Sequence, residues 1–152
     1  MLKKIISNKI KKILFKNNNV ISVSIVGSFN DNKSIKNIGD IDVVLILNKI
    51  NKEDFNRCNN SILSQKKFFE LRFKKQLIIN NTFGPIKFDY SKFIVIHLMI
   101  YDISSHIYHV QNSPFTCFDW ERSNNFIGKS LKEICSVNAL TLHDFYSSRR
   151  SP

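Results

Sequence analysis

Two short patterns with chemical potential lie close together near the start of the chain. Gly27-Ser28 closes an apolar run that begins at Val20. Asp40-Ile41-Asp42 opens a second apolar run, which ends at Leu47. Carboxylates at positions i and i+2 of a strand point to the same face. Because acidic side chains rarely lie in an apolar strand without a partner, this pair predicts a divalent cation such as Mg²⁺.

A glycine and a hydroxyl residue at the end of a strand suit a phosphate group. Glycine lets the backbone approach a phosphate closely. Backbone N–H groups after the strand, together with the Ser28 hydroxyl, are able to hold terminal phosphates. We therefore expect Gly27 and Ser28 to bind phosphate beside the cation held by Asp40 and Asp42. In the alternative interpretation these residues have no chemical role: Gly27-Ser28 is a plain turn and Asp40 caps a loop.

The apolar periodicity predicts helices and strands in mixed order, which favours an α/β or α+β fold. Helices are expected at 2–16, where apolar residues recur at helical spacing, and at 52–64, with Asn51 as the cap. Strands are expected at 20–26, 41–47, 76–79 and 94–101. Residues 29–39 and 102–125 are predicted as loops, the second long and structured, and 66–75 fits no single class. Short helices at 130–135 and 140–146 precede a solvated tail.

The combined pattern resembles the nucleotidyltransferase superfamily of the DNA polymerase β type, especially its small single-domain members. Val26-Gly27-Ser28, a gap of eleven residues and Asp40-Ile41-Asp42 all follow the signature of that family. The resemblance implies a short mixed sheet with flanking helices, as one domain over residues 1–152. It also implies metal-dependent transfer of a nucleoside monophosphate from a nucleoside triphosphate, with ATP expected, to an acceptor hydroxyl. Mg²⁺ or Mn²⁺ would be the cofactor, held by Asp40 and Asp42.

A third carboxylate, which active members of the family usually carry on a later strand, has no obvious counterpart. The strand predicted at 94–101 offers His97 at the equivalent place. In one interpretation His97 is a catalytic residue, as a neutral metal ligand or a general base. In another, Asp89 or Asp102 supplies the acid, although Asp102 has the opposite parity to His97. In the third, the site is degenerate and only binds nucleotide, as in an antitoxin-like regulatory module that could form a homodimer.

A second polar cluster at residues 102–122 includes His106, His109 and Trp120. No spacing within it matches a zinc motif. An ordered surface loop is the simple interpretation, and a wall that selects the acceptor is the alternative. Nothing in this segment identifies the acceptor.

Composition limits the remaining classes. The net charge of +11 is dispersed, and the joint excess of Lys, Asn and Ile is typical of an A/T-rich coding sequence. Nucleic acid binding therefore remains an alternative that the charge alone does not establish. The three cysteines are far apart, which favours a reducing cytoplasm over a disulfide framework. No apolar run reaches the roughly 18–20 residues of a membrane span, and the first residues do not resemble a signal peptide.

Overall fold

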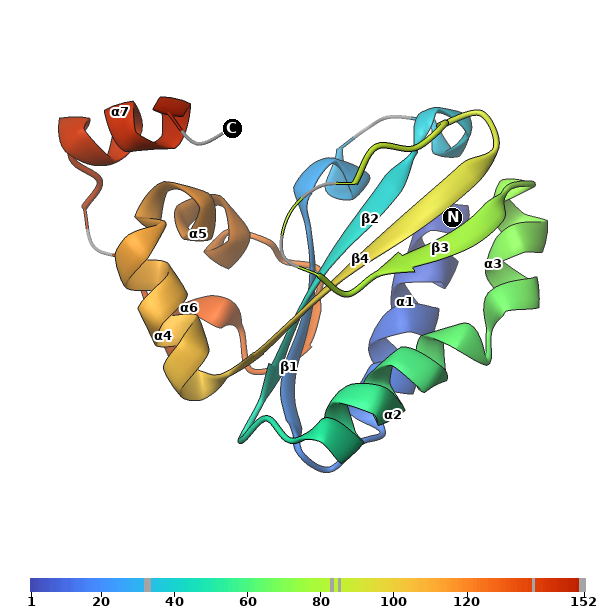
Figure 1. Ribbon diagram of the computed structural model, residues 1–152, viewed down its shortest axis with the longest axis horizontal. Helices are drawn as coiled ribbons and strands as arrows, with labels where there is room; N and C mark the ends of the chain where they lie inside the picture. Colours follow the sequence, from blue (N-terminus) through green and yellow to red (C-terminus); the bar gives the residue numbers. More distant parts are fainter. Residues whose placement is uncertain (32–33, 83, 85, 138, 151–152) are drawn as a thin grey trace.

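A five-stranded mixed sheet in the order β3-β4-β2-β1-β5 carries the fold (Figure 1). The computed structural model describes residues 1–31, 34–82, 84, 86–137 and 139–150. β1 pairs antiparallel with β2 and β5, whereas β4 pairs parallel with β2 and β3. The strands are β1 Val20–Val26, β2 Asp40–Leu47, β3 Gln76–Asn80, β4 Phe93–Asp102 and β5 Phe126–Gly128.

Helices cover both faces of the sheet (Figure 1). They are α1 Leu2–Phe15, α2 Lys52–Leu63, α3 Lys66–Phe73, α4 Ile103–Asn112, α5 Pro114–Glu121, α6 Leu131–Ile134 and α7 Leu142–Arg150, with the 3₁₀ turns η1 Gly27–Asn30 and η2 Ile35–Asn37. One core lies between the sheet and α1, α2 and α3, and a smaller one lies between the sheet and α5 and α6. In the described part of the chain, no helix is both long enough and apolar enough to cross a membrane.

This mixed sheet with flanking helices confirms the predicted fold class. The predicted helices and strands from residue 2 to residue 101 are present within one residue of their expected ends, and residues 66–73 are helical. Asn51 caps α2, because its side chain accepts a hydrogen bond from the backbone N–H of Asp54. Alternating or helically spaced apolar residues set these elements, so the sequence pattern was sufficient to find them.

The predicted long loop at 102–125 is wrong, because α4 and α5 occupy most of it. Asp102 begins α4 with a capping box in which its carboxylate accepts the backbone N–H of Ser105 at 2.8 Å. Pro114 then opens α5 at the first helical position, where a missing N–H costs nothing. The predicted solvated tail agrees with the exposure of Ser147, although the backbone of residues 147–150 continues α7; residues 151–152 lie outside the described residues.

The rings of the second polar cluster, those of His106, His109 and Trp120, pack toward the smaller core, whereas Asp119 is exposed. His106 is 1 % exposed, and neither of its ring nitrogens has a hydrogen-bond partner among the described residues. Burial lowers the pKa of His106 to about 4, so this imidazole is neutral at physiological pH. The ring of His109 stacks on Tyr101 and lies against Trp120. These rings therefore belong to the smaller core, and they are poorly placed to contact an acceptor.

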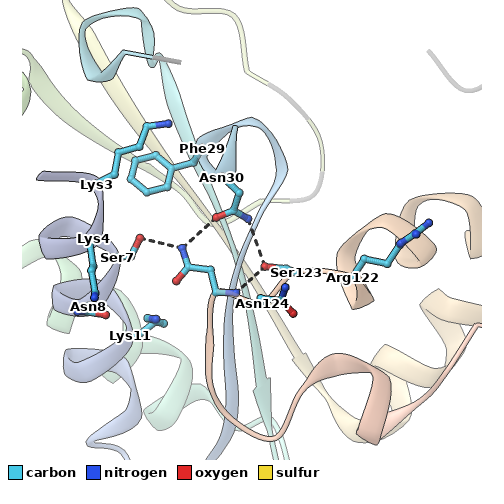
Figure 2. A pocket seen from close by; sticks show the side chains of 11 residues that line it. Lys3, Lys4, Ser7, Asn8, Lys11, Phe29, Asn30, Arg122, Ser123 and Asn124 are labelled. Atoms are coloured by element: carbon cyan, nitrogen blue, oxygen red, sulfur yellow. Dashed lines mark hydrogen bonds between the residues drawn. The ribbon is translucent and has the colours of Figure 1, made fainter. Parts of the chain in front are cut away.

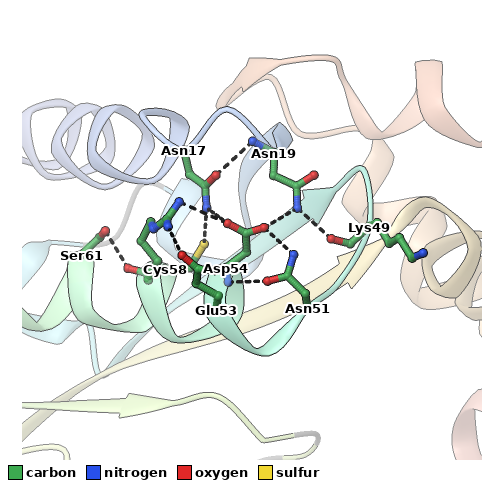
Figure 3. Close-up of polar contacts among 9 residues, drawn as sticks. Asn17, Asn19, Lys49, Asn51, Glu53, Asp54, Cys58 and Ser61 are labelled. Carbon is green, nitrogen blue, oxygen red and sulfur yellow. Dashed lines mark hydrogen bonds and ion pairs between the residues drawn. The ribbon is translucent and has the colours of Figure 1, made fainter.

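A network of polar side chains joins the end of α1 to the start of α2 (Figure 3). The Asp54 carboxylate accepts hydrogen bonds from Asn17 at 2.9 Å, Asn19 at 2.8 Å and Asn51 at 2.7 Å. These bonds, with that of Asn17 the strongest contributor, hold the pKa of Asp54 below its usual range. Because these hydrogen bonds satisfy the Asp54 carboxylate, its burial needs no functional explanation. It fixes the loops at the end of the sheet opposite to Gly27.

Candidate metal centre

Three of the residues predicted from sequence meet at one end of the sheet. The antiparallel register of β1 and β2 places Val26 opposite Asp42, and the parallel register of β2 and β4 places Asp42 opposite His97. Asp40 lies two residues before Asp42 and shares its face. One ligand atom from each of Asp40, Asp42 and His97 lies within 4.8 Å of the others. The arrangement is a candidate metal centre built from two central strands.

Electrostatic crowding distinguishes this cluster from an ordinary surface. Burial, and then the neighbouring charge of Asp40, raise the pKa of Asp42 to about 6, with His97 acting in the opposite direction. Nε2 of His97 lies 3.6 Å from Oδ2 of Asp40, which is too far for a strong hydrogen bond. Two carboxylates thus share one partly buried position without a full counter-charge. A divalent cation bound between them would supply that charge.

Gly27 provides the close wall of the site. Its φ of +72° lies in the left-handed region, and a Cβ at this position would stand 2.6 Å from Oδ2 of Asp42. Only glycine satisfies both the backbone and the space. Ser28 follows in η1 and is exposed, and its hydroxyl has no hydrogen-bond partner among the described residues. The Gly27-Ser28 turn therefore abuts the carboxylates and leaves a hydroxyl free for a ligand.

Replacing Gly27 with alanine tests this contact. We expect Gly27→Ala to lose about 1–2 kcal/mol of unfolding free energy from the backbone alone, and also to weaken Mn²⁺ binding, because the new methyl group displaces the Asp42 carboxylate. Gly84→Ala is the matched control, since Gly84 has a φ of +109° but no atom within 4 Å of the place that a Cβ would take. Urea titration measures stability and calorimetry measures Mn²⁺ affinity. Equal loss of Mn²⁺ affinity in both variants would contradict the proposed contact.

The hydrogen bonds of Asn80 define the state of His97. Oδ1 of Asn80 accepts from the backbone N–H and the hydroxyl of Thr82 at 3.1 and 2.6 Å, and Nδ2 donates to the Gly84 carbonyl at 3.0 Å. Reversing the amide would oppose donor to donor and acceptor to acceptor, so this orientation is assigned from the network. The second N–H of the Asn80 amide then faces Nδ1 of His97 at 3.0 Å.

An imidazole that accepts at Nδ1 carries its proton on Nε2 when neutral. Nε2 is the His97 atom that points toward Asp40. In this tautomer His97 presents an N–H to the carboxylates and has no lone pair there for a metal or for a proton. The geometry therefore favours Asp40 and Asp42 as the ligands, with the N–H of His97 facing them from 3.6 Å.

Neither alternative acid lies in the cluster. Asp102 pairs with Leu47 at the far end of β2, and its bonds to Ser105 lower its pKa to about 2. The Asp89 carboxylate already accepts hydrogen bonds from the hydroxyl and the backbone N–H of Ser91, at 2.6 and 2.9 Å. Asn80 is the residue that sequence reasoning missed. The signal was the register of β3 on β4, which places Asn80 opposite His97 and is not readable from either strand alone.

Comparisons of the chain with protein-family models, with curated proteins and with solved structures find no match. The interpretation of the site therefore rests on its own residues and geometry.

Proposed function

We propose that the protein transfers a nucleoside monophosphate from a nucleoside triphosphate, ATP in the first instance, to an acceptor hydroxyl. The observation that supports this proposal is the meeting of two β2 carboxylates with the Gly27-Ser28 turn, at a spacing and in strands that suit both a cation and phosphates. The raised pKa of Asp42 is a second support, because it marks a position where negative charge lacks a partner.

In this proposal each residue has a separate task. Asp40 and Asp42 hold Mg²⁺ or Mn²⁺, which when bound supplies positive charge against the triphosphate. The backbone after Gly27 and the hydroxyl of Ser28 bind the terminal phosphates. His97 lies beside Asp40, with Nε2 3.6 Å from Oδ2, and adds an electrostatic contact to that carboxylate. The acceptor oxygen bonds to the α-phosphorus, the bond from phosphorus to the bridging oxygen breaks, pyrophosphate leaves, and the hydroxyl proton passes to water.

A second candidate function is nucleotide binding without transfer. The observation that favours it is the tautomer of His97, since a donor at this position does not replace the third carboxylate of an active nucleotidyltransferase-like site. Such a protein would act in regulation, through a partner that responds to the bound nucleotide. The two candidates share the ligand and differ only in turnover.

Calorimetry and a pyrophosphate assay together separate these candidates. We expect ATP to bind in the presence of Mn²⁺ and not in excess EDTA, because the carboxylates repel the triphosphate without a cation. Pyrophosphate release with RNA, protein or small hydroxyl acceptors would support the transferase. Binding with no release from any acceptor would support the regulatory module. Absence of binding in both conditions would overturn both.

A further inference from the structure

A basic pocket lies beside η1, the turn that also carries Gly27. It has a volume of about 590 Å³ and is formed by α1, η1 and the segment 122–125 (Figure 2). The charged side chains that line it are all cationic: Lys3, Lys4, Lys11 and Arg122. In the part of the chain that the structure describes, none of these four side chains forms an ion pair with a carboxylate. The pocket therefore concentrates positive charge that nothing in the described fold neutralises.

The lysines of α1 are held close to one another. Lys4 and Lys11 are seven residues apart, which places them two turns apart on one face of the helix. Figure 2 shows Lys4, Asn8 and Lys11 along one side of the pocket. Partial burial, and then repulsion from Lys4, lower the pKa of Lys11. An anion placed between the two ammonium groups would relieve this repulsion.

The floor of the pocket is a rigid polar network that joins three distant parts of the chain. Asn125 donates to the Ser7 hydroxyl and to Oδ1 of Asn30, each at 3.0 Å. Asn30 in turn donates to the Ile25 carbonyl at 2.9 Å, and Ser123 donates to the same carbonyl. These bonds fix the shape of the pocket before any ligand enters. Preorganisation of this kind lowers the entropic cost of binding.

The lining of the pocket indicates the class of anion. Seven residues of helix rise about 10 Å, so Lys4 and Lys11 spread positive charge along one wall of the pocket. Amide and hydroxyl groups between cations are the usual partners of backbone phosphate and sugar oxygens. A single-stranded nucleic acid backbone, which a positively charged groove tracks without reading sequence, fits this lining.

The pocket and the candidate metal centre share the η1 turn. Phe29 lines the pocket and lies two residues after Gly27, the residue whose Cβ would touch Asp42. Lys3 lies over the Phe29 ring, with its ammonium nitrogen 5.5 Å from the ring centroid. We propose that the basic pocket binds the phosphate backbone of a single-stranded nucleic acid.

Fluorescence anisotropy with a labelled single-stranded RNA of about ten nucleotides tests the binding. The titrations are made in EDTA without nucleotide, so they do not depend on the metal centre. For the wild-type chain we expect binding that weakens steeply as salt rises from about 50 to 200 mM. In the double variant Lys4→Gln/Lys11→Gln we expect affinity at least about tenfold lower, and a salt slope smaller by about 1.4 for two lost contacts.

Lys67→Gln/Lys132→Gln is the matched control, because it removes the same charge at exposed positions outside the basic pocket. We expect it to change affinity less than about threefold, and thermal melting checks that both variants are folded. Equal weakening in the two double variants, or no RNA binding at about 50 mM salt, would overturn the proposal. Inorganic triphosphate that displaces the RNA at equal concentration would also overturn it, in favour of a small polyphosphate ligand. Loss of the proposed nucleotide binding in other tests would leave this result unaffected.

Discussion

Asp42→Asn is expected to abolish metal-dependent ATP binding and pyrophosphate release while the protein stays folded. Asp42 supplies one of the two carboxylates of the candidate metal centre, and an amide binds Mg²⁺ or Mn²⁺ far more weakly than a carboxylate. A loss of at least about 100-fold in affinity corresponds to about 2.8 kcal/mol. Calorimetry with Mn²⁺ and ATP measures the affinity, and thermal melting measures the stability.

In the absence of metal, Asp42→Asn is expected to gain stability relative to the wild-type chain, although it loses ligand affinity. Asp42 has a raised pKa, so the folded state holds its proton more tightly than the unfolded state does. The wild-type chain in EDTA is therefore expected to lose stability as pH rises from about 4 to about 6, the interval between the unfolded and folded values. Asp42→Asn removes this titration and should lack that loss. Melting temperatures at several pH values across this interval make the comparison.

Asp89→Asn is the control for these experiments. It makes the same acid-to-amide change at a carboxylate that is bonded to Ser91 and lies outside the cluster. Its ATP affinity and turnover should match those of the wild-type chain. Retained metal-dependent binding in Asp42→Asn, or an equal loss in Asp89→Asn, would contradict the assignment of the metal centre to Asp40 and Asp42.

The sequence was sufficient to predict that Asp40 and Asp42 share one face, because both lie in a strand with a strong apolar pattern. His97 was expected beside them only from the resemblance to a known family. The period of two in β2 sets the shared face of Asp40 and Asp42, and Gly27 closes the strand beside them. The central sheet could be predicted for the same reason. The placement of a side chain can be predicted in this way when it depends only on the pattern of its own strand.

Contacts between separate helices and strands could not be predicted from local sequence patterns. Asn80 reaches His97 only because β3 and β4 pair in one particular register, and no local pattern specifies that register. The basic pocket likewise joins α1 to a segment more than 100 residues away, so the sequence does not show that Arg122 lies near the three α1 lysines of the pocket. The helices α4 and α5 were missed because their polar residues outweighed their capping signals. In each case tertiary packing supplied the information.

His97→Asp is expected to raise Mn²⁺ affinity by about tenfold or more and to lower the melting temperature of the metal-free protein. The register of β4 against β2 places residue 97 directly opposite Asp42, so an aspartate there adds a third carboxylate to the cluster. Asn80 would still donate its second N–H, now to a carboxylate oxygen of the aspartate in place of Nδ1 of His97, which holds the new side chain toward the site. Without metal, three neighbouring carboxylates repel one another, and this repulsion opposes folding.

His97→Asn separates charge from shape in the same experiment. Asparagine has the size of aspartate but adds no negative charge, so His97→Asn should show no gain in Mn²⁺ affinity and no loss of stability from repulsion. If the wild-type chain binds ATP without turnover, His97→Asp is also the variant in which pyrophosphate release should first appear. Equal Mn²⁺ affinity in the aspartate and asparagine variants would mean that residue 97 does not face the cation, and that Asn80 orients His97 for the stability of the sheet alone.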